Sequence, residues 1–310
     1  MQPAPEPPAV DRPDAGRRLV GLALGSALVG APGLFGGCSF VAGEDHRGPD
    51  APRALPLARP VRMAWVLSSG GPRGFVHVGV LKALGELGLQ PDLIVGASVG
   101  ALVGTLHAAG MAPDVIEQLA LDLNPVAMAR LAIGADERFS GAPLADLVRA
   151  RLPSPPHLDR LPLAMAVAAA RRDDGQVVAF TAGDAGVAVQ ASAAVEGQFA
   201  PVRIDGQAYV DADRHAPLPV RLARALGAQR VLAVDASAHE DRAPPGAERY
   251  RAGDLRKRAL TAVDAREADL VLHPDFGYWV SLSRDFRERA IAAGHRDTLA
   301  QADALRRLHA

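Results

Sequence analysis

The residue with the clearest capacity for chemistry is Ser98, which lies between Gly96 and Gly100 in a Gly-x-Ser-x-Gly pattern. The apolar residues 93–97 predict a buried strand, and residues 101–109 predict a helix. A serine on such a tight strand-to-helix turn has a strained backbone, and a Cβ atom two positions before or after it would clash. The helix N-terminus also favours negative charge beside the serine. The pattern predicts a nucleophilic serine next to an oxyanion site; the alternative is a helix start that is merely rich in small residues.

A glycine-rich loop precedes the serine turn and follows another predicted strand, residues 63–67. After the loop, apolar residues at helical spacing predict a helix over residues 76–87. Such a loop presents backbone N–H groups to an anion, which is either a nucleotide phosphate or a reaction oxyanion. The sequence lacks the Gly-x-Gly-x-x-Gly spacing and the Gly-Lys-Ser/Thr run of nucleotide sites, so we expect an oxyanion hole. Its expected residues are Gly70, Gly71, Arg73 and Gly74.

These segments form a strand-helix-strand-helix unit, and parallel strands would bring the loop and the serine turn to the same edge of a sheet. Further along, an Asp-Asp-Gly turn at residues 173–175 predicts a hairpin, and residues 230–234 and 268–272 predict buried strands. Predicted helices alternate with these strands, the last two over residues 283–292 and 298–308. The expected fold class is α/β, a three-layer α/β/α sandwich with a mostly parallel central sheet.

The loop and the serine turn together resemble the patatin-like phospholipase family, whose paired signatures are a Gly-Gly-x-Arg-Gly oxyanion loop and a Gly-x-Ser-x-Gly turn. The first signature lies at residues 70–74, the second is centred on Ser98, and the resemblance covers most of residues 63–308. It implies a patatin-like fold, a Ser–Asp dyad that works without histidine, and hydrolysis of phospholipids or other acyl esters. It implies neither a metal ion nor a cofactor.

The resemblance assigns the catalytic aspartate to Asp211, which ends a short predicted strand and matches the family's aspartate block. Ala212 follows where the family usually has glycine, and Glu196 replaces a proline common near the family's Ala-Ser segment, here residues 187–194. If position 212 required a positive φ, alanine would cost about 1 kcal/mol and displace the carboxylate. Asp213 is the nearby competitor for the role, and a second alternative is that both aspartates only cap the next helix.

Two other functions remain open at this point. An α/β-hydrolase would use a Ser-Asp-His triad with the histidine at His239, His273 or His295, although none of these lies in a distinctive block. The departures at Ala212 and Glu196 would also fit a membrane-tethered scaffold whose catalytic site has decayed. Hydrolysis of a soluble ester separates these alternatives.

Composition excludes several other classes. The 310 residues have 49% hydrophobic content, enough for a large buried core, and a net charge of −1. Aromatic residues make up only 4% and no basic stripe accompanies them, so we expect no nucleic-acid partner. The single cysteine, Cys38, excludes an intrachain disulfide framework and a zinc site of several cysteines.

The N-terminal region predicts export and a lipid anchor. Two arginines precede an apolar run over residues 19–35, and small residues lead to Cys38. This ending resembles a bacterial lipobox, which implies acylation of Cys38 and a membrane-anchored lipoprotein of the cell envelope; the alternative is an uncleaved signal or simple anchor. We therefore predict a signal peptide at residues 1–37, a flexible tether at 38–60 and a hydrolase domain at 61–310. A lipid substrate and the membrane would be its partners, and the oligomeric state is left open.

Overall fold

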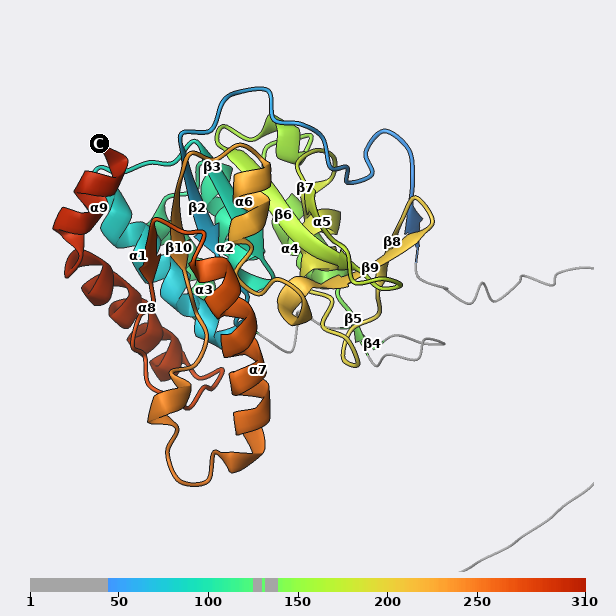
Figure 1. The fold of residues 1–310 in the computed structure, drawn as a ribbon. Helices are drawn as coiled ribbons and strands as arrows, with labels where there is room; N and C mark the ends of the chain where they lie inside the picture. Colours follow the sequence, from blue (N-terminus) through green and yellow to red (C-terminus); the bar gives the residue numbers. More distant parts are fainter. Residues whose placement is uncertain (1–43, 125–129, 132–138) are drawn as a thin grey trace, which may run out of the picture. The chain divides into compact units, whose positions relative to one another are not determined.

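A nine-stranded sheet organises the part of the chain that the computed structural model describes, residues 44–124, 130–131 and 139–310 (Figure 1). Neighbouring strands follow the order β1 (Asp45–His46), β8 (Val202–Ile204), β9 (Gln207–Asp211), β6 (Ala164–Arg171), β3 (Leu93–Ala97), β2 (Met63–Leu67), β10 (Arg230–Val234) and β11 (Leu270–Leu272), and β7 (Val177–Phe180) is a further partner of β6. The run from β6 to β11 pairs in parallel. Strands β7 and β9 pair with β6 in the antiparallel sense, and the β6–β7 pair confirms the predicted hairpin. A separate pair joins β4 (Arg130–Leu131) and β5 (Phe139–Ser140).

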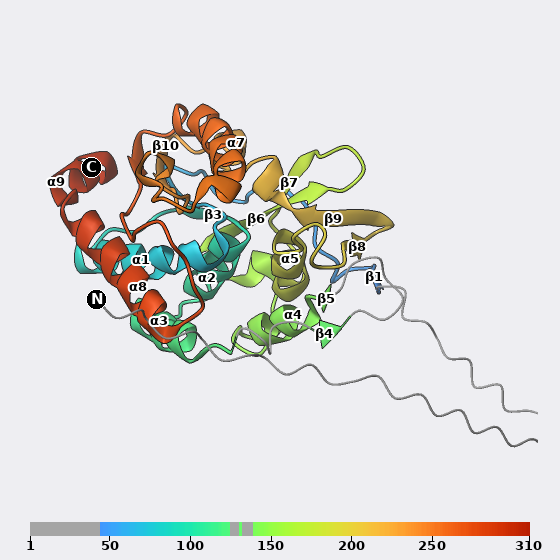
Figure 2. The same cartoon turned by 90° about the horizontal axis from the view of Figure 1, so that it is seen from below.

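Helices cover both faces of this sheet. One face carries α1 (Val76–Glu86), α2 (Val99–Ala108), α3 (Pro113–Asp122), α4 (Ala142–Arg149), α5 (Ala185–Ser192), α8 (Arg284–Leu299) and α9 (Ala302–His309). The other face carries α6 (Val220–Ala225) and α7 (Glu248–Ala265). Figure 2 shows α7 on one side of the strands and α1, α3 and α8 on the other. The predicted α/β fold, with a mostly parallel central sheet between helical layers, is confirmed.

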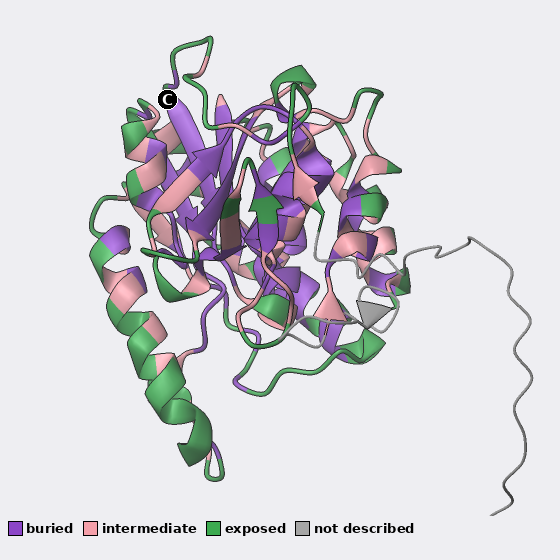
Figure 3. Cartoon of the chain, turned by 90° about the vertical axis from the view of Figure 1, so that its right-hand side faces the viewer, coloured by how far each residue is buried: buried purple, intermediate pink, exposed green. Residues whose placement is uncertain are grey.

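The central strands are buried on both faces. In β2, Trp65 and Leu67 enter the larger apolar cluster, which also contains residues of α1 and α8, whereas Ala64 and Val66 enter the smaller cluster with residues of α6. Every residue of β2 and β3 is buried (Figure 3). Strands covered on both faces need apolar side chains at every position, so these segments are continuous apolar runs in the sequence.

The helix that follows the glycine-rich loop, α1, packs closely on α8. At Gly79 an added Cβ would lie 1.9 Å from the backbone oxygen of Ile291, and at Gly294 it would lie 2.2 Å from that of Val76. Glycine at both positions lets the two helices approach backbone to backbone. This contact with α8 fixes the position of α1, the helix that follows the glycine-rich loop.

Residues 44–60 differ from the flexible tether that the sequence predicts. Strand β1 pairs with β8, and Ala51 is buried. The backbone of Arg53 exchanges hydrogen bonds of 3.0 and 3.1 Å with Ala182. We call residues 44–60 the strap. Polar and backbone contacts hold it, and its sequence has no hydrophobic period, so the sequence alone has the character of a linker. The packed part of the chain therefore begins before residue 61.

Helix α7 begins at Glu248, although the sequence shows little sign of a helix there. Only Thr261 and Asp264 on it are buried, so apolar periodicity does not mark its first turns. The predicted signal peptide and Cys38 lie outside the described residues. Within the described ranges, no helix combines the length and the apolar character needed to cross a bilayer.

Candidate active site

Ser98 occupies the turn between β3 and α2 in a conformation that side chains rarely adopt, with φ 53° and ψ −121°. Asp205 is the other non-glycine residue with positive φ in the described part of the chain. A Cβ at Gly96 would lie 2.5 Å from the oxygen of Gly100, and a Cβ at Gly100 would lie 2.3 Å from the oxygen of Leu67. Both flanking glycines are therefore sterically required by the turn. The strained turn holds Ser98 at the carboxyl end of a central strand.

The register of β6 brings Asp211 to the serine turn. Strand β7 occupies one edge of β6 over residues 167–170. On the opposite edge, β3 ends with Ala97 opposite Ala168, and β9 arrives from the other direction and ends with Asp211 opposite Ala169. One edge of a strand accepts one partner at each position, so β3 and β9 meet end to end there. The two candidate catalytic residues therefore lie at the junction of two strand ends.

Ser192, the last residue of α5, fills the junction. Its hydroxyl donates to the carbonyl oxygen of Ala168 at 2.6 Å and accepts from the backbone N–H of Ser98 at 2.8 Å. Two residues later, Ala194 accepts a 2.9 Å hydrogen bond from the backbone N–H of Asp211. The end of α5 thus holds both candidate residues, and sequence reasoning missed Ser192 as an individual residue although it lies in the Ala-Ser segment already singled out.

The Asp211 carboxyl is buried, with an exposed fraction of 4%. Burial raises its pKa to about 7, and the negative charge of Asp213 adds to this rise. Hydrogen bonds from the Ser98 hydroxyl and from the backbone N–H of Asp213, the latter 2.9 Å long, act in the opposite direction. At neutral pH this carboxyl is close to its midpoint of ionisation, where a group can both take and return a proton.

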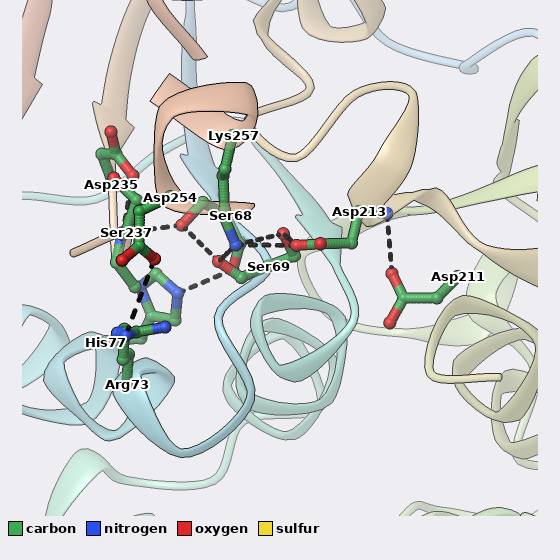
Figure 4. A network of polar contacts seen from close by, with 11 residues as sticks. Ser68, Ser69, Arg73, His77, Asp211, Asp213, Asp235, Ser237, Asp254 and Lys257 are labelled. Carbon is green, nitrogen blue, oxygen red and sulfur yellow. Dashed lines mark hydrogen bonds and ion pairs between the residues drawn. The ribbon is translucent and has the colours of Figure 1, made fainter. Parts of the chain in front are cut away.

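Asp213, the alternative to Asp211 as the catalytic aspartate, contacts Ser69 and Lys257 (Figure 4). Its carboxylate accepts a hydrogen bond from the Ser69 hydroxyl and forms a 2.7 Å ion pair with the Lys257 ammonium of α7. Burial alone would raise the pKa of Asp213, but Lys257 and Ser69 hold it below its ordinary value. The Lys257 ammonium also donates to the backbone oxygen of Ser69 at 3.1 Å. Asp213 is therefore a charged partner of Lys257, whereas the pKa of Asp211 is raised.

The glycine-rich loop begins one residue after Ser69 and continues as a 3₁₀ turn over Gly71–Phe75. A Cβ at Gly74 would lie 2.1 Å from a methyl carbon of Val99, the residue after the serine, so the loop packs directly on the serine turn. Within the loop, the Arg73 N–H donates to the oxygen of Gly70 at 3.1 Å. The Arg73 guanidinium lies 4.0 Å from the Asp254 carboxylate of α7.

The two departures near Asp211 fit their surroundings. Ala212 is fully buried in a 3₁₀ turn over Ala212–Arg214, and its φ is not positive, so it carries no strain of the kind that would require glycine. Glu196 forms a 3.6 Å ion pair with Arg214.

The histidines that a Ser-Asp-His triad would need make other contacts. His239 and His273 stack with ring centroids 3.7 Å apart, and each binds a backbone carbonyl oxygen. His295 pairs with a glutamate of α1 at 2.9 Å. Among the described contacts, none joins these rings to Ser98 or Asp211, which disfavours the triad.

His77, on α1, is fully buried behind the glycine-rich loop. Burial lowers its pKa to about 4, so it is neutral at pH 7, and its Nε2 lies 2.9 Å from the backbone oxygen of Ser68. It therefore supports the loop rather than acting as a base. In the residues that the structure describes, no three His, Cys, Asp or Glu side chains are grouped to hold a metal ion.

Comparison with known proteins matches these same segments. Residues 65–224 match the family model described as Patatin-like phospholipase. An uncharacterized NTE family protein of Mycobacterium tuberculosis is 34% identical over 182 residues, which are 58% of this chain and 50% of that protein. Lysophospholipase NTE1 of Coccidioides immitis is 28% identical over 203 residues, covering 58% of this chain and 12% of the relative.

The similarity extends to solved structures. The crystal structure of VipD from Legionella pneumophila aligns with a TM-score of 0.46 and 15% identity, covering 86% of this chain and 72% of that one. The chain spans half or less of the length of these curated relatives.

Proposed function

Since the chain belongs to the patatin-like phospholipase family, we propose that it is a carboxylic ester hydrolase that removes acyl chains from phospholipids or related lipid esters, with Ser98 as nucleophile and Asp211 as base. One observation carries this proposal: a serine on a strained turn meets a buried carboxyl whose pKa is raised to about 7. The printed name of the fungal relative, a lysophospholipase, supports a lipid ester as the substrate class.

In the proposed reaction, Asp211 accepts the proton of the Ser98 hydroxyl while the serine oxygen attacks the ester carbonyl carbon. Backbone N–H groups of the glycine-rich loop, at Gly70 and Gly71, stabilise the resulting oxyanion. Collapse of the tetrahedral intermediate expels the alcohol, which takes the proton from Asp211, and leaves an acyl-serine. Water then gives a proton to Asp211 as its oxygen attacks the acyl carbon, and the serine oxygen recovers that proton when the acid leaves.

The test is hydrolysis of a short-chain p-nitrophenyl ester by the full chain, compared with Ser98→Ala and Asp211→Asn. Both variants should lose at least about 1,000-fold in kcat/KM, because each removes a participant in the covalent step. Replacing His239, His273 or His295 by alanine provides the control, since these variants should keep their activity.

The outcomes separate the competing functions. Loss of activity in one histidine variant alone would support the Ser-Asp-His triad. An inactive parent protein whose Ser98 is not labelled by a fluorophosphonate probe would support the decayed scaffold. If the parent protein hydrolyses the ester, the next substrates to assay are lysophospholipids and phospholipids.

The location in the cell is a further part of this proposal. The sequence before Cys38 supports an exported lipoprotein, and an acyl anchor would hold the hydrolase beside its substrate. Cells grown with a labelled fatty acid should yield labelled protein, and Cys38→Ser should abolish the label. Retained label in that variant would contradict acylation at Cys38.

A further inference from the structure

A group of large apolar side chains is exposed around the start of α7. Tyr250 is 43% exposed, Trp279 is 50% exposed, and Val280 and Leu282 on the same loop are 36% and 49% exposed. The Tyr250 and Trp279 rings meet edge to face with centroids 6.0 Å apart. We call Tyr250, Trp279, Val280 and Leu282 the aromatic patch. Contiguous exposed apolar groups of this kind mark interaction surfaces.

Two basic side chains flank Tyr250 in the aromatic patch. Arg249 and Arg251 are exposed on either side of Tyr250, and the Arg249 guanidinium lies 4.6 Å from the centre of the Tyr250 ring. The nearby acid Asp254 is turned toward the protein, where its carboxylate pairs with Arg73 and accepts from the Tyr278 hydroxyl. Glu248 is the exposed acid on this first turn, and it accepts from the N–H of Gly246. The surface that faces solvent thus combines aromatic rings with positive charge.

The aromatic patch is continuous with the candidate active site along one face of α7. Tyr250, Asp254 and Lys257 follow one another at helical spacing, and Lys257 binds Asp213 and Ser69. Lys257 lies seven positions after Tyr250 on the helix, a rise of about 10 Å. In Figure 1, α7 extends beyond the lower ends of the strands, so its first turns stand clear of the sheet. A surface that docks there would lie about two helical turns from the site.

We propose that the aromatic patch, with Arg249 and Arg251, docks on the surface of a phospholipid bilayer that carries anionic headgroups. Tryptophan and tyrosine rings favour the headgroup region because one side is apolar and the other polar, and arginines are attracted to anionic lipids. The inference rests on the proposed function, since the bilayer is the store of the substrate. It adds the face by which the protein approaches that store.

Tryptophan fluorescence tests the docking directly, because the chain has two tryptophans and Trp65 is only 1% exposed. The full chain carrying Ser98→Ala is mixed with vesicles of phosphatidylcholine and phosphatidylglycerol whose acyl chains are brominated. Docking should shift the Trp279 emission to the blue and quench it, and vesicles of phosphatidylcholine alone should do so less. An emission that stays unchanged while the protein sediments with the vesicles would overturn the proposal, because another region would then be bound.

Charge reversal tests the role of the arginines. Arg249→Glu with Arg251→Glu should raise the lipid concentration needed for half-maximal quenching by at least roughly 30-fold, because the attraction of two arginines to the anionic surface is lost and the new glutamates are repelled by it. Arg306→Glu with Arg307→Glu, two exposed arginines of α9, makes the same change of net charge elsewhere and is the control. An equal effect of both pairs would contradict a specific docking face. Docking is measured on the Ser98→Ala protein and hydrolysis on the parent protein, so the two results are independent. If vesicles quench Trp279 but the parent protein does not hydrolyse the ester, only the proposed function is contradicted.

Discussion

At the residue scale, the burial of Asp211 has two opposing effects: it places the carboxyl next to Ser98, and it disfavours the ionised form that a base must have. As the proposed base, Asp211 must be a carboxylate to accept the serine proton, yet burial raises its pKa to about 7. The protonated form is inactive, so kcat/KM should rise with pH through an apparent pKa near 7 and fall about tenfold per pH unit below it. A pH profile with the p-nitrophenyl ester measures this limb. A flat profile down to pH 5 would exclude Asp211 as the titrating base.

The raised pKa of Asp211 should also make the free energy of unfolding depend on pH. A carboxyl with a pKa of about 7 when folded, against an ordinary 3.8, binds its proton more tightly in the folded state. The folded state of the parent protein therefore loses stability as the pH rises from about 4 to about 7. Asp211→Asn removes this charge and should gain up to about 4 kcal/mol in the free energy of unfolding at pH 8, while losing activity. Urea unfolding at pH 8 and pH 5 measures the gain, which should shrink at the lower pH.

The charges next to Asp211 should move its titration in opposite directions. The positive charge of Lys257 lowers the pKa of Asp211, and the negative charge of Asp213 raises it. In Lys257→Met the acid limb of the pH profile should move to higher pH, and in Asp213→Asn it should move to lower pH. Two shifts of the same sign would indicate a structural disturbance rather than a charge effect.

Some of these residues carry a sequence signal and others do not. Ser98 and the flanking glycines are evident because the strained turn needs a fixed spacing. Lys257 is one of only two lysines in the chain, the other being Lys82, so its presence in an arginine-rich helix was a usable signal. Ser192 offered none beyond the Ala-Ser segment, because its role depends on a hydrogen bond to the Ala168 carbonyl beside the point where two strands meet.

At the element scale, the central strands could be predicted from the sequence, but the end-to-end arrangement of β3 and β9 could not. Strands β2, β3 and β10 are buried on both faces, so their apolar runs identify them. The arrangement of β3 and β9 end to end along β6 joins residues more than 100 positions apart, and no local pattern encodes it. The active site depends on that arrangement because it sets the separation between Ser98 and Asp211.

The contact between α1 and α8 makes an element-scale prediction with an internal control. In Gly294→Ala the new Cβ would lie 2.2 Å from the backbone oxygen of Val76, so the helices must separate and the free energy of unfolding should fall by about 2 kcal/mol or more. Gly85→Ala, in α1 with nothing within 4 Å of the new Cβ, should instead gain about 0.5–1 kcal/mol. Urea unfolding compares them, and an unchanged free energy of unfolding in Gly294→Ala would contradict the close approach.

At the scale of the whole molecule, residues 44–60 connect the start of the domain to its active site. Arg53 and Leu55 bond to Thr181 and Ala182, and the Asp50 carbonyl accepts from the N–H of Asp184, the residue that caps α5. The other end of α5 carries Ser192, which holds the serine turn. The strap therefore fixes the N-terminus of the helix whose C-terminus holds the turn at Ser98.

A chain that begins at residue 61 should consequently be less stable and less active than one that begins at residue 44. Loss of the strap removes at least five backbone hydrogen bonds and the burial of Ala51, so the free energy of unfolding should fall by about 2–4 kcal/mol, partly offset by the entropy of the freed segment. Because α5 loses a support, kcat should fall more than KM rises. Urea unfolding and ester kinetics on the two chains measure both effects. Equal stability would mean that the strap adheres without holding α5, and the turn at Ser98 would then depend on the sheet alone.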